Sequence, residues 1–135
     1  MQLPHELVVF KFLPVLRGQV VRILLSEHKL KQTEIARAMG ITQAAVSHYF
    51  HADRGHDEPL LSMFPEIGVH ARSIASAIAE GASEPMQVAL FAKAVNEMMS
   101  TERFCSYHKA SSGIEQCNVC FEENFARFVP LRGSP

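Results

Sequence analysis

The sequence predicts an all-α fold for this chain of 135 residues. Apolar residues recur three and four positions apart over several long stretches, which is the spacing of one helix face. Strand-like alternation and internal repeats do not stand out. Because 47% of the residues are hydrophobic, the chain can bury one real core, and we expect a compact helical body with a short appendage.

The first long helix is predicted from about Pro14 to Glu27, and before it Pro4 and Glu6 suit the first turn of a helix. Its apolar face is formed by Leu13, Leu16, Val20 and Ile23. Because proline disturbs the turn before it, Pro14 is expected to limit the short segment 7–13. Two further helices are predicted up to about Phe50.

Two amphipathic helices are predicted in the second half, after a loop. Residues 51–59 are rich in turn formers and are predicted to be that loop. The stripe of the first helix is Ile67, Ala71, Ile74 and Ile78, and Gly81 can end this helix in a left-handed conformation. Ser83 can cap the second helix. The stripe of that helix is Val88, Phe91, Val95 and Met98.

The distribution of charge along the chain is more informative about a DNA partner than the net charge of -1. Residues 1–54 hold seven Lys or Arg against four acids, which gives +3, and the rest of the chain carries -4. A DNA-binding face is therefore expected in the N-terminal part. No apolar run reaches the roughly 18 residues of a membrane span, and the N-terminus does not read as a secretory signal. We expect a cytoplasmic protein that does not enter the membrane.

The segment 32–50 carries the strongest signal in the chain, that of a helix-turn-helix. Two short helices that cross steeply must bury apolar residues against the helix before them, and these are Ile35, Met39, Ile41, Val46 and Tyr49. Ala36 is small, so the two helices can approach closely. Gly40 falls where the turn needs a positive φ. Thr42 can cap the next helix and leave its first amides open to phosphate.

These residues resemble the helix-turn-helix of Cro/CI-type regulators. The longer stretch, from Leu3-Pro4-His5-Glu6-Leu7-Val8-Val9 to Thr42-Gln43-Ala44-Ala45-Val46-Ser47, resembles the DNA-binding domain of archaeal members of that class. The resemblance covers about the first 55 residues and implies a DNA-binding unit over 1–55. One departure is Lys31, which stands where a capping Ser or Thr is common, so Glu34 has no capping-box partner.

The resemblance also implies roles for individual residues. Gln32 takes a position that contacts phosphate or braces a neighbour, and Gln43 takes the main base-reading position. Glutamine can bond bidentately to adenine, alanine can meet a thymine methyl, and histidine can donate to guanine or phosphate. The predicted DNA-binding residues are Gln32, Thr42, Gln43, Ala44, Ser47, His48, His51 and Arg54. The alternative is a three-helix interaction module in which His48 and His51 are solvated surface residues.

The three cysteines lie close together near the C-terminus, in a C-x2-H-x8-C-x2-C array. Its members are Cys105, His108, Cys117 and Cys120. Zinc in a closed Cys3His site is the favoured cofactor, because the ligand set and spacing suit tetrahedral coordination. An iron-sulfur cluster is the first alternative, and metal-free thiols with a reversible disulfide between Cys117 and Cys120 are the second. Residues 101–120 hold few large apolar groups, so metal binding is expected to order the segment 101–135.

The preferred interpretation is a DNA-binding transcription regulator that is not an enzyme. Double-stranded DNA is its expected partner, and residues 56–100 are expected to form the contact of a twofold-symmetric homodimer, with core packing within one chain as the alternative. A thiol-disulfide redox protein is disfavoured because no βαβ pattern accompanies the C-x2-C pair. A metal-stabilised adaptor that binds proteins is the third possibility.

Overall fold

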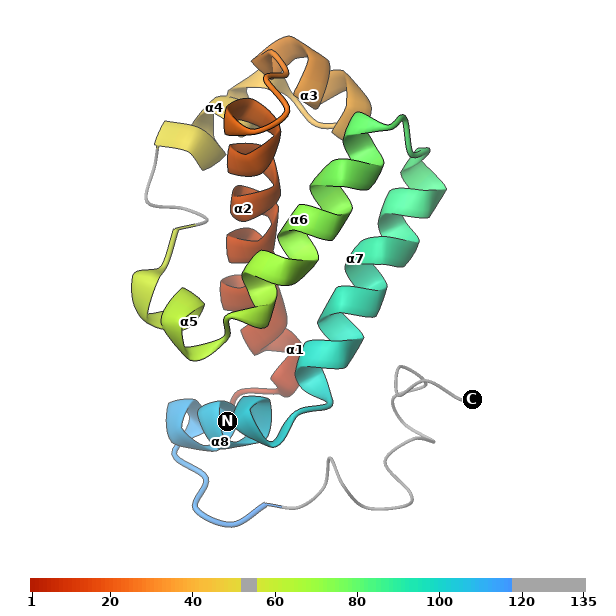
Figure 1. Cartoon of the computed structure of the whole chain (residues 1–135). Coiled ribbons are helices and arrows are strands. Elements are labelled where there is room, and N and C mark those ends of the chain that lie inside the picture. Colours follow the sequence, from red (N-terminus) through yellow and green to blue (C-terminus); the bar gives the residue numbers. More distant parts are fainter. Residues whose placement is uncertain (52–55, 118–135) are drawn as a thin grey trace.

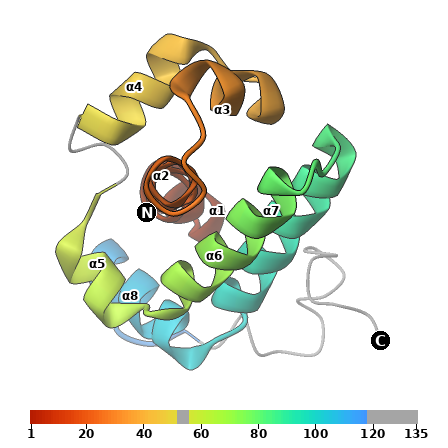
Figure 2. The ribbon, with the colours of Figure 1, turned by 45° about the horizontal axis from the view of Figure 1, so that its top comes forward.

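The computed structural model describes residues 1–51 and 56–117, which are entirely helical in their regular structure, so the all-α prediction is confirmed for this part of the chain. One long helix, α2 (Leu13–Ser26), runs through the middle of the molecule. Seen end-on in Figure 2, it is surrounded by the other helices. It packs most extensively against α6 (Glu66–Ala79). No helix within these ranges is both long and apolar enough to span a membrane.

The N-terminal helix does not break at Pro14, contrary to the expectation. Instead α1 (Pro4–Leu7), the π-helical segment η1 (Val8–Phe12) and α2 follow one another without a break. Proline has no N–H, and its ring crowds the carbonyl four residues earlier. A π-helical turn, in which the Leu13 N–H donates to the Val8 carbonyl five residues back, widens the helix just before the proline. The sequence pattern did not indicate this widening.

Two short helices pack on one end of α2, as predicted. These are α3 (Gln32–Met39) and α4 (Gln43–His51), and they lie together at the top of Figure 1. Their inner faces bury Ile35 and Val46 completely, with Ala36 nearly buried. Met39, Ile41 and Tyr49 are half-buried against the same core.

The predicted loop 51–59 contains more helix than expected. His51 belongs to α4, and α5 (Glu58–Met63) begins inside the segment. The Asp57 side chain accepts a hydrogen bond of 3.0 Å from the Leu60 N–H, and Pro59 occupies the second helical position. Proline and aspartate, taken as turn formers, are here helix-start residues.

The two amphipathic helices are confirmed, and they pack side by side. All four residues of the predicted α6 stripe are buried. Gly81, just after α6, has a φ of +94°, as expected for a left-handed helix end. Ser83 caps α7 (Glu84–Met99) by accepting from the Met86 N–H at 3.4 Å.

The predicted α7 stripe is only partly buried. Met98 is buried, whereas Phe91 and Val95 are partly exposed and Val88 is 68% exposed. The fully packed face of α7 instead carries Gln87, Ala94 and Met98.

Residues 102–112, at the start of the segment expected to be ordered by a metal, form a helix. This helix, α8 (Glu102–Ser112), is capped by the Thr101 hydroxyl and ends at Gly113, whose φ is +68°. It lies at the end of the molecule opposite α3, as Figure 1 shows. The few aromatic residues judged too sparse to fix it are in fact concentrated on its inner face.

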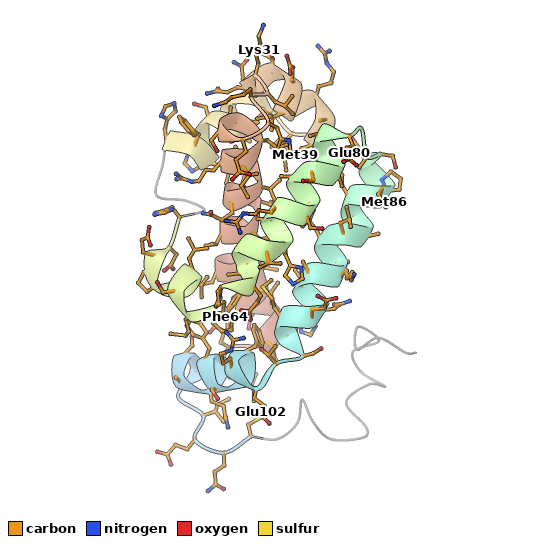
Figure 3. All side chains as sticks on the ribbon, viewed as in Figure 1. Lys31, Met39, Phe64, Glu80, Met86 and Glu102 are labelled. Atoms are coloured by element: carbon orange, nitrogen blue, oxygen red, sulfur yellow. The ribbon has the colours of Figure 1, made fainter. Side chains whose placement is uncertain are left out.

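Four aromatic rings hold α8 on the body. The Phe12 ring lies 4.9 Å from the Phe64 ring and 5.2 Å from the Phe104 ring, and Tyr107 lies 5.7 Å from both Phe12 and Phe64. Figure 3 labels Phe64 where α8 meets the rest of the molecule. Because these rings come from η1, the end of α5 and α8, the contact joins distant parts of the chain into one core.

Candidate nucleic-acid interface

The turn between α3 and α4 has the geometry that the sequence predicted. Gly40 has φ +64° and ψ +32°, which glycine adopts without steric cost. The Ile41 N–H donates to the Ala36 carbonyl at 3.0 Å, and the Gly40 N–H donates to the Arg37 carbonyl at 3.4 Å. These two bonds form a Schellman motif, which ends α3 and turns the chain directly into α4.

The start of α4 is capped as predicted. The Thr42 hydroxyl accepts a hydrogen bond of 3.0 Å from the Ala45 N–H. The cap leaves the first amides of the helix facing outward, where they can bind phosphate oxygens. At the start of α3 the Lys31 side chain makes no capping hydrogen bond, in agreement with the missing capping box.

One face of α4 is buried and the opposite face is free. Val46 is completely buried, and α4 packs on both α2 and α3. The free face carries the predicted base-reading residues, of which Gln43, Ala44 and His48 are exposed and Ser47 is half-buried. The spacing of these four positions places them on one side of the helix. The sequence-predicted set is thus brought together on a single surface.

The other predicted DNA-binding residues are placed less uniformly. His51 is exposed at the end of α4, where its ring lies 4.7 Å from that of Phe50. Gln32 is half-buried in the first turn of α3, and among the described residues it makes no side-chain hydrogen bond that would show the bracing role. Arg54 lies outside the described residues.

Basic residues lie on α3 and in the turn before it. From His28 to His51 the chain holds three lysines or arginines and one acidic residue. The three basic residues are Lys29, Lys31 and Arg37, all exposed. Figure 3 labels Lys31 at the α3 end of the molecule. Lys29, in the turn that connects α2 to α3, has a φ of +57°. Hydrophobic periodicity does not predict this conformation.

A buried glutamine that the sequence analysis missed fixes this unit to α7. Gln87 is only 6% exposed, and its side-chain amide donates to the carbonyls of Ala38, at 2.7 Å, and Ala82, at 3.1 Å. Ala38 lies in the last turn of α3, where helix carbonyls lack partners within the helix. The amide thereby ties the unit formed by α3 and α4, called the reading unit after its predicted role, to the helical body. A polar residue inside an apolar stripe was the one available signal.

The predicted metal ligands are only partly described. Cys105 and His108 are both buried on the inner face of α8, whereas Cys117 lies beyond the helix and is half-buried. Within residues 1–51 and 56–117, no three His, Cys, Asp or Glu side chains come together as a metal site would require. Because Cys120 lies outside the described residues, the four-ligand centre stays a prediction.

The structure gives His108 a different contact. Its Nε2 lies 2.6 Å from the backbone oxygen of Gln2. Since a carbonyl oxygen only accepts, Nε2 must carry the proton, and Nδ1 is the nitrogen left for a metal. Ser111 and Ser112 also donate to Gln2, so the C-terminal end of α8 holds the N-terminal segment of the chain.

Comparison with protein-family models, curated proteins and solved structures finds no match to this chain.

Proposed function

We propose that this protein is a sequence-specific DNA-binding regulator in which α3 and α4 form a helix-turn-helix and α4 enters the major groove. The observation that carries the proposal is the free face of α4, where Gln43, Ala44, Ser47 and His48 stand together without an acidic residue on the helix. A helix of this kind fits the major groove, in which each base pair presents a distinct pattern of donors and acceptors.

Two further features support this proposal. The capped start of α4 offers outward-facing amides to a phosphate, and three exposed basic residues lie on α3 and the turn before it. Phosphate contacts of this type position a protein on the duplex, whereas the contacts of α4 would read the sequence. The alternative, a protein-interaction module, predicts no such division between positioning and reading residues.

A binding measurement at 0.15 M salt tests the proposal. The purified chain is titrated onto the duplex upstream of its own gene and onto a random duplex of equal length. We expect tighter binding to the former, with a difference typical of specific recognition, from about a thousandfold upward. Equal affinity for both duplexes would remove the regulator proposal.

We also propose that the regulator acts as a homodimer, because one unit makes few base contacts and two half-sites multiply affinity. The dimer contact differs from the one first expected, because the α6 stripe is buried in the core of the same chain. The exposed apolar residues of α7, Met86 and Val88, remain available. Sedimentation at tens of micromolar tests this assembly, and a monomer alone would contradict it.

A further inference from the structure

An open groove lies between the reading unit and α7, with a volume of about 580 Å³. One wall is formed by α3, the turn and α4, and includes the half-buried residues Met39, Ile41 and Tyr49. The other wall is α7, and the floor is formed by η1 and α2. Ligand sites in proteins have volumes of about 300 to 1,000 Å³ and are lined mostly by apolar side chains with a few polar ones. The groove fits both criteria.

Four of the lining residues carry charged or amide side chains, namely Arg17, Glu84, Gln87 and Asn96. Arg17 and Glu84 carry opposite charges on different helices, and within the described part of the chain neither forms an ion pair. Both amide hydrogens of Gln87 are used by the carbonyls of Ala38 and Ala82. The oxygen of this buried side chain is therefore the atom left to accept a hydrogen bond.

The hydrogen-bond acceptors Glu84 and Gln87 and the cation Arg17 lie on different helices of the groove. Glu84 and Gln87 lie in the first turn of α7. The Glu84 carboxylate lies beside Gly40, so close that a Cβ at position 40 would collide with it. This end of the groove offers two acceptors, one of them charged. Arg17, on α2, offers a cation with five donors. A complementary molecule therefore places a cationic donor at α7 and an anion at α2.

We propose that this groove binds a small apolar zwitterion, whose ammonium meets Glu84 and Gln87 and whose carboxylate meets Arg17. The apolar body of the ligand would lie on Phe91, Val88 and Tyr49, which are otherwise only partly covered. An apolar dipeptide is the simplest molecule with these features, because its two charges are separated by a backbone with its own N–H. The groove contacts both α4 and α7, so occupancy is linked to the placement of the reading helix.

Three matched probes test the binding site by calorimetry on the full chain. They are the dipeptide leucyl-phenylalanine, its N-acetyl derivative without the ammonium, and its C-terminal amide without the carboxylate. We expect the zwitterion to bind several-fold more tightly than either blocked form, as exposed ion pairs allow. In Glu84→Gln the N-acetyl form should bind as tightly as the zwitterion, because the partner of the ammonium is gone. In Arg17→Gln the amide form should bind as tightly as the zwitterion, because the partner of the carboxylate is gone. Unchanged thermal unfolding of both variants without ligand serves as the folding control.

Two results would overturn the site. One is equal binding of all three probes, with no effect of either variant. The other is failure of all three probes to bind, whether or not the chain forms a dimer through Val88.

The regulatory part of the inference rests on the proposed function, whereas the binding does not. By reciprocity, a ligand that changes DNA affinity must itself bind more or less tightly when DNA is present, by the same factor. We therefore expect the Kd for the zwitterion to shift on adding the specific duplex. Binding of the zwitterion without such a shift would overturn the regulatory role alone, and calorimetry still decides the site if the chain binds no DNA.

Discussion

At the scale of single residues, Gly40 lends itself to a matched comparison with Gly113. Both glycines end a helix with nearly equal φ angles, +64° and +68°. Alanine at either position should lower the free energy of unfolding by about 1 to 2 kcal/mol, the usual strain of an L-residue in this region. The Glu84 carboxylate beside Gly40 adds little, because it ends a flexible exposed side chain that can turn aside. Urea denaturation measures both effects.

The two glycine variants should differ in DNA binding. Gly40 sets the angle between α3 and α4, whereas Gly113 ends α8 at the other end of the molecule. We expect weaker DNA binding in Gly40→Ala only. Equal DNA affinity in the two variants would separate the turn from the function proposed for it.

Gln43 is the residue on which sequence specificity should depend most. Gln43→Ala removes the bidentate donor and acceptor pair, which should weaken binding to a specific site by about 1 to 3 kcal/mol and relax preference at one base position. Ser73→Ala, an exposed change on α6, is the control and should leave affinity unchanged. Binding to a set of duplexes with single-base changes reads out the prediction. A uniform loss across all of them would mean that Gln43 contacts only the backbone of the DNA.

At the scale of elements, the sequence predicted best where one face of a helix meets a single core. The α6 stripe, the Gly40 turn and the Thr42 and Ser83 caps depend on neighbours in sequence, and all are present. The packing of α8 depends on partners far along the chain, which hydrophobic periodicity does not indicate. The same holds for Gln87, whose partner Ala38 lies 49 positions away.

Measurements on α8 distinguish aromatic packing from metal binding as the source of order in residues 102–112. Phe104 is 1% exposed, so Phe104→Ala should destabilise the fold by about 3 to 5 kcal/mol and loosen residues 102–112. A chelator or Cys117→Ser should leave α8 protected, even where either removes a bound metal. Hydrogen exchange and metal analysis on the same samples distinguish the two. Loss of protection of α8 on chelation would restore the metal as its organiser.

Zinc analysis and an absorption spectrum of protein purified without air address the predicted ligand set itself. If His108 is a ligand, it must bind through Nδ1 or give up its bond to Gln2. His108→Ala should then release metal, together with the Cys117 variant. If substitution of Cys117 or Cys120 lowers the metal content and substitution of His108 does not, His108 is not a ligand. The metal would then be bound by the cysteine pair together with other ligands.

At the scale of the whole molecule, the exposed Lys29 and Lys31 lie at the end formed by α3. The reading unit and its lysines lie at one end, and α8 lies at the other (Figure 1). The net charge of -1 is a sum over the whole chain, so a pI near 6.6 does not exclude a local group of exposed lysines at this end. Under the proposed function, the end that carries α3 and α4 faces the duplex, whereas composition alone argues mildly against a nucleic-acid partner.

Two lysines at opposite ends test this orientation. Lys31→Ala and Lys109→Ala change the net charge of the protein equally, and neither lysine forms an ion pair among the residues the structure describes. Because each phosphate contact releases condensed counterions, Lys31→Ala should weaken binding to every duplex alike. It should also reduce the slope of log affinity against log salt by about 1. Lys109→Ala should leave the slope unchanged, since α8 faces away from the duplex. If the two variants reduce the slope equally, binding responds to net charge alone and α3 is not at the interface.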